Sequence, residues 1–255
     1  MTETGPEFLD VGRGGAARRI AVQVRDGSGP PVVWLGGFRS DMTATKATAL
    51  DDWAAATGRK LVRFDYAAHG ASGGTFTDCT ISTWLEDAEA VLGAHVDEAP
   101  ILVGSSMGGW IACLAARARA ARGGKTAGLV LIAPALDFTE DLIWNRLSDA
   151  ARAMMLRDGV LKKPSAYAPE PDPITLALIE DGRRNRMLDG MLELGGPVHV
   201  LQGMRDSDVP HTHALKILGH LPAEGTVLTL IADGDHRLSR PQDIARLVAA
   251  VAEIA

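Results

Sequence analysis

Short apolar runs alternate with longer helix-type segments along most of this chain. The apolar runs have the length of buried strands, and the segments between them have the length and composition of helices. Strands that alternate with helices predict an α/β fold with a mostly parallel, doubly wound sheet. The predicted strands cover residues 19–24, 31–35, 60–64, 100–103, 127–133, 196–203 and 226–231, and the predicted helices cover 41–57, 81–95, 109–119 and 242–254.

One segment of about 60 residues interrupts this alternation. From Leu136 to Gly195 the sequence contains no convincing strand, but it does contain several methionines and four prolines. A crossover between two strands needs far fewer residues. We therefore predict a single α/β domain over residues 1–255, with a helical lid inserted at about 136–195, after the sixth strand. The alternative is an ordinary pair of surface helices joined by a proline-rich linker.

Composition narrows the class of protein. A chain of 255 residues can bury a full core, and a net charge of −6 gives no reason to expect a nucleic-acid partner. No run reaches the ~18 apolar residues of a membrane span. The first ten residues resemble neither a signal peptide nor a transit peptide. We expect a cytoplasmic protein, with Cys79 and Cys113 as free thiols. The sequence does not indicate an oligomeric state.

The segment Gly104-Ser105-Ser106-Met107-Gly108 has the pattern G-x-S-x-G. It lies between a predicted strand and a predicted helix, which is the context that a nucleophile elbow requires. Its glycines have no Cβ, so they allow the strand and the helix to approach closely. The pattern therefore predicts Ser106 as a nucleophile. The alternative, a chance pentapeptide in a glycine-rich chain, does not account for the flanking strand and helix.

A nucleophilic serine needs a base, and the base needs an acid that orients it. The loop after strand 226–231 contains one histidine, so His236 is the predicted base. The loop after strand 196–203 contains two acids. We favour Asp206 as the acid because of the spacing G-x-x-D-x-x-V-P, with Asp208 as the runner-up. His69, in the loop after strand 60–64, is predicted to hold a turn.

Substrate contacts are predicted less specifically. The oxyanion of a tetrahedral intermediate needs backbone N–H donors, and we expect them at Met107 and at Phe38, in the loop after strand 31–35. Arg183, Arg184 and Arg186 either contact an anionic part of the substrate or form a solvated helix face. Apolar side chains that either line an acyl pocket or belong to the core are Trp110, Trp144, Met154, Met155 and Met187.

Three segments carry a resemblance to a known family: 104–110, 203–210 and 234–239. With them, the chain resembles the α/β-hydrolase superfamily over essentially its full length. Together they are similar to the motifs of the mitochondrial palmitoyl-protein thioesterases, also called mycophenolic acid acyl-glucuronide esterases, and of their bacterial relatives. The resemblance implies a triad of Ser106, Asp206 and His236 and activity on acyl thioesters or acyl-sugar esters.

The expected function is that of a serine hydrolase. It would cleave carboxylic ester or thioester bonds through an acyl-enzyme, with an apolar acyl group on a small-molecule substrate. No cofactor and no metal is expected, because the chain has no G-x-G-x-x-G at its first strand-to-helix turn, no P-loop and no cluster of metal ligands. An amidase or peptidase, a carbon–carbon hydrolase or a perhydrolase would use the same triad. A more remote alternative is a non-catalytic binding protein of the same fold.

Overall fold

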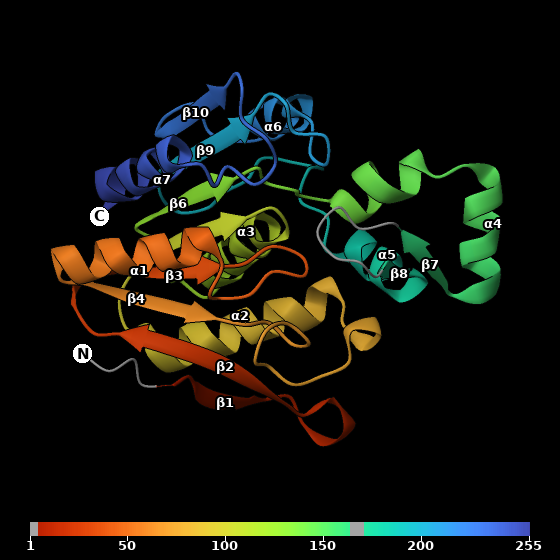
Figure 1. The fold of residues 1–255 in the computed structure, drawn as a ribbon, viewed down its shortest axis with the longest axis horizontal. Helices are drawn as coiled ribbons and strands as arrows, with labels where there is room; N and C mark the ends of the chain where they lie inside the picture. The colour runs from red at the N-terminus through yellow and green to blue at the C-terminus, as the bar shows by residue number, and fades with distance from the viewer. Residues whose placement is uncertain (1–4, 164–170) are drawn as a thin grey trace.

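The protein is built around a twisted central sheet (Figure 1). The computed structural model describes residues 5–163 and 171–255, and within them eight strands form this sheet in the order β1-β2-β4-β3-β5-β6-β9-β10. Strand β2 runs antiparallel to both β1 and β4, and the other neighbouring pairs are parallel. The strands are β1 (Glu7–Val11), β2 (Arg18–Arg25), β3 (Ser28–Leu35), β4 (Arg59–Phe64), β5 (Ile101–Ser105), β6 (Gly128–Ile132), β9 (Val198–Gly203) and β10 (Thr226–Ile231).

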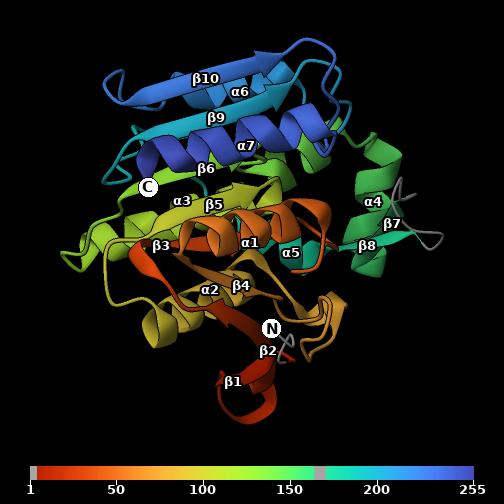
Figure 2. The ribbon, with the colours of Figure 1, turned by 60° about the vertical axis from the view of Figure 1, so that its left-hand side comes forward.

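Helices cover both faces of the sheet (Figures 1 and 2). In β3, Val32 and Trp34 pack with the cluster that includes α1 and α7, whereas Val33 and Leu35 pack with α2, α3 and α6. A strand that is buried on both faces reads as a continuous apolar run, which is why β3 was recognisable in the sequence. These helices are α1 (Thr45–Thr57), α2 (Ile81–His95), α3 (Met107–Ala121), α6 (His211–Leu218) and α7 (Pro241–Ile254).

The predicted α/β architecture is confirmed in its main elements. Helix α2 begins after Thr80, whose hydroxyl accepts the N–H of Thr83 in a capping box, and its bounds match the predicted helix 81–95. The prediction missed β1, which is short and mostly exposed and is held by its pairing with β2. Both cysteines, Cys79 and Cys113, are free and buried. Among the described residues, no helix combines the length and apolarity needed to cross a bilayer.

The insertion follows β6, and it is not purely helical. Strands β7 and β8 form an antiparallel pair within it, so the expectation of a segment without strands was wrong. The pair is short and contains Pro173, one of the prolines that the alternative interpretation assigned to a linker. Its elements are η3 (Thr139–Ile143), η4 (Trp144–Arg146), α4 (Asp149–Asp158), β7 (Val160–Lys163), β8 (Asp172–Thr175) and α5 (Leu176–Arg184).

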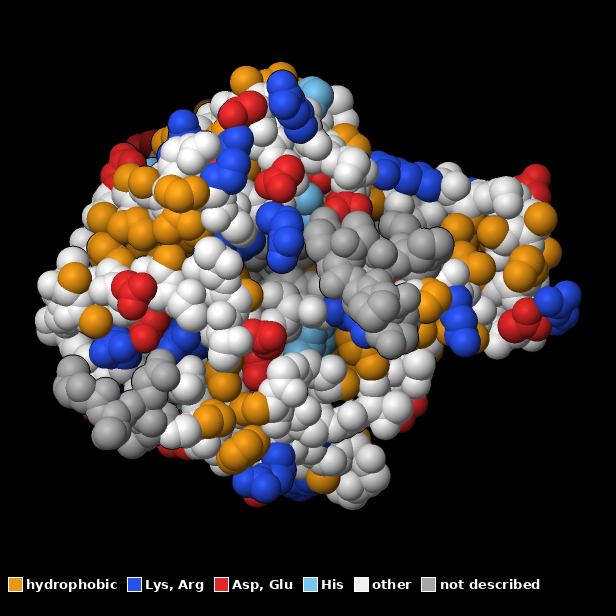
Figure 3. Space-filling model, in the orientation of Figure 1, with side chains coloured by type: hydrophobic (Ala, Val, Ile, Leu, Met, Phe, Trp, Pro, Cys, Tyr) orange, Lys and Arg blue, Asp and Glu red, His pale blue; other side chains and the backbone are white. Residues whose placement is uncertain are grey.

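This insertion projects from the body of the molecule beyond one end of the sheet (Figures 1 and 2). Apolar side chains gather on the projection (Figure 3). Met154 and Leu156 of α4 are exposed. The insertion contacts the body through an ion pair of 3.0 Å between Asp172 of β8 and Arg39, which follows β3. A second contact comes from Asp181 of α5, whose carboxylate accepts the backbone N–H and the hydroxyl of Ser82.

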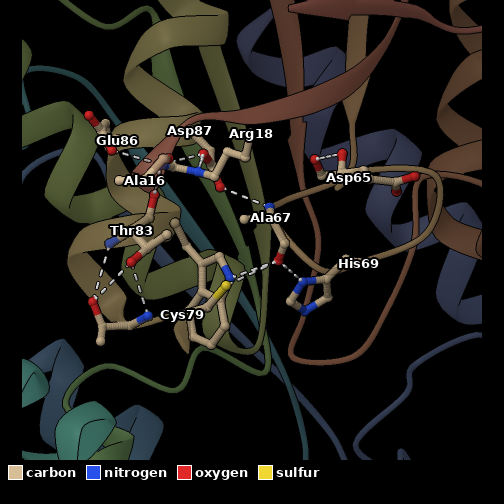
Figure 4. Close-up of polar contacts among 12 residues, drawn as sticks. Ala16, Arg18, Asp65, Ala67, His69, Cys79, Thr83, Glu86 and Asp87 are labelled. Carbon is tan, nitrogen blue, oxygen red and sulfur yellow. Dashed lines mark hydrogen bonds and ion pairs between the residues drawn. The ribbon is translucent and has the colours of Figure 1, made fainter. Parts of the chain in front are cut away.

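A buried ion pair fixes the loop that follows β4. Arg18 Nε donates to Asp87 Oδ1 over 2.7 Å, and the other Asp87 oxygen accepts the N–H of Ala67 over 2.8 Å (Figure 4). The guanidinium also pairs with Glu86 at the surface. Burial raises the pKa of Asp87 to about 6, although the Ala67 bond and the charge of Arg18 oppose this shift. The conformation of this loop therefore depends on Arg18, whose positive charge compensates the buried carboxylate of Asp87.

We predict that Arg18→Met destabilises the protein more at pH 8 than at pH 5. The raised pKa means that Asp87 contributes most to stability below its unfolded pKa of about 3.9, and that this contribution is lost as the pH rises through about 6. Without Arg18 the charged form becomes costlier still, so the loss at pH 8 should reach roughly 3 kcal/mol. Urea unfolding at both pH values measures it.

The matched control is Arg19→Met, the neighbouring residue in β2. Its guanidinium lies 4.2 Å from the ring centroid of Phe8, and its removal should cost less than about 1 kcal/mol at either pH. Equal losses for the two variants, or a larger Arg18→Met loss at pH 5, would contradict a charge-balancing role for Arg18.

Candidate active site

Ser106 lies in a strained turn between β5 and α3. Its φ of 55° is unusual for a residue with a side chain, and its N–H donates to Ile132 O over 2.9 Å, which holds the turn in place. A Cβ on Gly108 would overlap the carbonyl oxygen of Leu35, and one on Gly104 would overlap that of Gly108. Both glycines are therefore required by the close approach of strand and helix.

The side chains of Ser106, His236 and Asp206 form one hydrogen-bonded chain. Ser106 Oγ lies 3.1 Å from His236 Nε2, and His236 Nδ1 lies 2.7 Å from Asp206 Oδ2. Since the carboxylate can only accept, Nδ1 carries the hydrogen and Nε2 is left to accept the serine proton. The three come from the turn after β5, the loop after β10 and the loop after β9, so the sheet brings together residues up to 130 positions apart.

Asp206, the acid favoured from the sequence, and Asp208, the runner-up, have different contacts in the structure. Asp206 contacts His236, while the backbone N–H groups of Asp208 and Val209 donate to Asp206 Oδ1 over 2.9 and 2.8 Å. Potential ligand atoms of Asp206, Asp208 and His236 lie within 4.8 Å of one another, so this is where the described residues could hold a metal ion. Both carboxylate oxygens of Asp206 are, however, already engaged within the protein.

Gln202 is a neighbour of this chain that sequence reasoning missed. Its side chain is fully buried, and Nε2 lies 3.1 Å from Asp206 Oδ2 and 3.0 Å from the carbonyl oxygen of Val209. The sequence did contain one indication of this role, because Gln202 is a polar residue near the end of a mostly apolar strand. The amide therefore holds the Asp206 carboxylate oxygen that also faces His236.

The two predicted oxyanion donors lie on segments beside Ser106. Met107 is the first residue of α3, and an N–H at that position has no acceptor within its own helix. Phe38 lies in the loop after β3, and this loop passes the elbow so closely that a Cβ on Gly37 would lie 3.5 Å from Ser106 Cβ. The ring of Phe38 packs edge-on against Phe76, with centroids 5.0 Å apart.

A cavity of about 280 Å³ borders Ser106 and His236. Its wall is mostly polar, with Phe38 and Trp34 as its large apolar side chains. Burial and then the charge of Arg237 lower the pKa of Lys46 to about 8. The other residues along the wall are Gly37, Arg39, Ser40, Asp41, Ala44, Thr45, Ser105 and Ser239.

The apolar residues predicted as a tentative pocket do not line this cavity. Trp110 is fully buried in the core, where its Nε1 donates to Asn185 O, and Met155 is fully buried within the insertion. Met187 is also buried, and Met154 is 46% exposed. Trp144 lies beneath the guanidinium of Arg183. The apolar character of these residues did not show whether each one faces the core, a cavity or solvent.

Arg183, Arg184 and Arg186 lie in ion pairs and do not border the Ser106 cavity. Each guanidinium lies within 3.0 Å of a carboxylate oxygen on the same or a neighbouring element. This arrangement favours a charged surface over an anion site. The pairs are Arg183–Glu140, Arg184–Asp181 and Arg186–Asp189.

Comparison with known proteins places this geometry in a family. Residues 32–171 match the family described as "Serine aminopeptidase, S33". Over 230 residues the chain is 30% identical to "Palmitoyl-protein thioesterase ABHD10, mitochondrial" of Bos taurus, a match that spans 90% of this chain and 74% of the relative.

Solved structures agree with that match. A putative hydrolase from Agrobacterium vitis S4 is 53% identical, with 98% of each chain covered and a TM-score of 0.95. Alpha/beta hydrolase domain-containing protein 10 from mouse is 26% identical, with 97% of this chain and 98% of that chain covered and a TM-score of 0.86. The expected α/β-hydrolase fold is thereby confirmed. The chain belongs to the serine aminopeptidase S33 family of α/β hydrolases and is a serine hydrolase.

Proposed function

We propose that this protein hydrolyses carboxylic esters or thioesters through an acyl-enzyme formed on Ser106. The observation that carries the proposal is the unbroken hydrogen-bonded chain from Ser106 Oγ through His236 to Asp206. The name of the bovine relative, a thioesterase, supports the same bond class.

The first half of the reaction forms the acyl-enzyme. Ser106 Oγ attacks the carbonyl carbon while His236 Nε2 takes the hydroxyl proton, and Asp206 stabilises the resulting imidazolium. The N–H groups of Met107 and Phe38 hold the oxyanion of the tetrahedral intermediate. As the intermediate collapses, the carbonyl re-forms, and His236 returns the proton to the departing alcohol or thiol.

The second half regenerates the enzyme. Water takes the place of the leaving group, His236 Nε2 accepts one of its protons, and the hydroxide attacks the acyl carbon. The same two N–H groups hold the second oxyanion. Collapse breaks the bond to Ser106 Oγ, which recovers its proton from His236, and the acid is released.

The cavity indicates the size of the substrate. A volume of about 280 Å³ lies below the ~300–1,000 Å³ that is usual for sites enclosing drug-sized ligands. The sequence predicts an apolar acyl group on the substrate. We propose that this acyl chain is short and that it contacts Phe38. The cytoplasmic location expected from the sequence stays a prediction, and the curated relatives are named mitochondrial.

Ser106→Ala should lower kcat for p-nitrophenyl butyrate by roughly 10⁶-fold, because the nucleophile is lost. Labelling by a fluorophosphonate probe should disappear with it, while the melting temperature stays near that of the wild type. The adjacent Ser105→Ala serves as the control and should retain activity. Substantial hydrolysis by a folded Ser106→Ala protein would refute the assignment.

Asp206→Asn should reduce kcat by about 10⁴-fold, because an amide can hold the wrong tautomer of His236. Asp208→Asn is the matched control, two residues away in the same loop, and should retain kcat within about threefold. Steady-state kinetics on one ester decides between the two acids. A larger loss for Asp208→Asn would reverse their roles.

Activity on p-nitrophenyl esters should peak at acyl chains of about two to six carbons and fall for longer ones, since each buried CH₂ gains about 0.8 kcal/mol only while it fits. A panel of matched ester, thioester and amide substrates compares the bond classes. A preference for the amide would favour the amidase alternative, and rising kcat/KM up to sixteen carbons would refute the short-acyl proposal.

A further inference from the structure

His69 connects two loops through both nitrogens of its ring. It lies in the loop after β4 and is buried there. Nε2 lies 3.0 Å from the backbone nitrogen of Arg39. Nδ1 lies 2.9 Å from the carbonyl oxygen of Ala67 (Figure 4). The N–H of Ala67 donates to Asp87, which fixes the position of Ala67. The His69 ring, which is bonded to Ala67 O, is therefore also fixed in position when it contacts Arg39.

These contacts determine which nitrogen carries the hydrogen. A backbone N–H can only donate, so Nε2 accepts from Arg39, and Nδ1–H donates to Ala67. Burial lowers the pKa of His69, the hydrogen bond to Ala67 opposes this shift and the Arg39 charge adds to it, so the net shift favours the neutral ring. Phe76 and Trp84 pack against the ring, with centroids 5.4 and 5.6 Å from its own. His69 Nε2 is therefore held both in the unprotonated form that accepts a hydrogen bond and in an orientation that faces the Arg39 N–H.

The residue at the other end of this bond is strained. Arg39 has a φ of 58°, a left-handed value that costs a non-glycine residue about 1–3 kcal/mol and persists only where its surroundings hold it. It directly follows Phe38, and the turn is closed by the Ser40 N–H, which donates to Gly37 O over 3.1 Å. A hydrogen bond to the Arg39 N–H thus acts on the same turn that presents the Phe38 N–H to the substrate.

We propose that His69 is a positioning residue, which holds the Gly37–Ser40 turn so that the Phe38 N–H is directed at the substrate oxyanion. This inference rests on the oxyanion role proposed for Phe38. An oxyanion forms only in the transition state and the intermediates, so loss of this alignment lowers kcat and leaves KM nearly unchanged.

Two substitutions separate the two hydrogen bonds. In His69→Gln the side-chain oxygen is as many bonds from Cα as Nε2 is, so it can accept the Arg39 N–H. In His69→Asn the amide ends at the position of Nδ1, so it can donate to Ala67 O but does not reach Arg39. His69→Phe keeps a ring among Phe76 and Trp84 and loses both bonds.

We expect activity to fall only in the variants that lose the hydrogen bond to the Arg39 N–H. His69→Asn and His69→Phe should lower kcat by roughly 10²-fold, the lower end for removal of an oxyanion donor, with KM within about twofold of the wild type. His69→Gln should stay within about fivefold. Inhibition by an arylboronate, which forms a tetrahedral adduct on Ser106, should weaken by the same factor as kcat/KM.

Ser72→Ala controls for general damage to the loop. The Ser72 hydroxyl donates to Asp65 O and accepts the Ala21 N–H, so its removal loosens the same loop without touching Arg39. It should lower the melting temperature and leave kcat unchanged. The proposal is overturned if a folded His69→Asn or His69→Phe protein keeps the wild-type kcat, if His69→Gln falls as far as they do, or if Ser72→Ala loses kcat equally. Failure of the proposed function is detected separately, by an active Ser106→Ala protein.

Discussion

The site depends on the contact between two backbones, that of the β3 end and that of the first turn of α3. At Gly108 the helix lies against the carbonyl oxygens of Leu35 and Gly36, with no room for a Cβ between them. This contact sets the distance between Ser106 and the loop that carries Phe38. Between β5 and this helix the chain passes through the strained φ at Ser106. The nucleophile and the proposed oxyanion donors are thus placed by one packing constraint.

Much of this arrangement was predictable because its signals are local. Gly104 and Gly108 flank the serine in sequence, and Thr80 marks the start of α2 by its own hydrogen bond. His236 was the one histidine in its loop. Each of these positions is defined by a few neighbouring residues, so a single sequence is enough to identify them.

The features that escaped prediction depend on partners distant in the chain. Strand β1 and the β7–β8 pair are stabilised by pairing with another strand. The sequence of a short segment does not show which strand it pairs with. Trp110 and Met155 were correctly read as apolar helix positions, but which way a helix turns such a face is decided by its tertiary contacts. His69 was correctly expected to hold a turn, and its second partner, 30 residues earlier, was not visible in the pattern.

The strand from which the insertion departs is tied to the nucleophile itself. The Ser106 N–H donates to Ile132 O at the end of β6, and the Ala135 N–H donates back to Ser106 O over 3.1 Å. The chain is therefore anchored at the elbow before it leaves the body of the protein. Because of this anchor, the projecting segment can change in length and sequence during evolution without moving Ser106 relative to His236. Substrate preference can therefore change while the catalytic chemistry is kept.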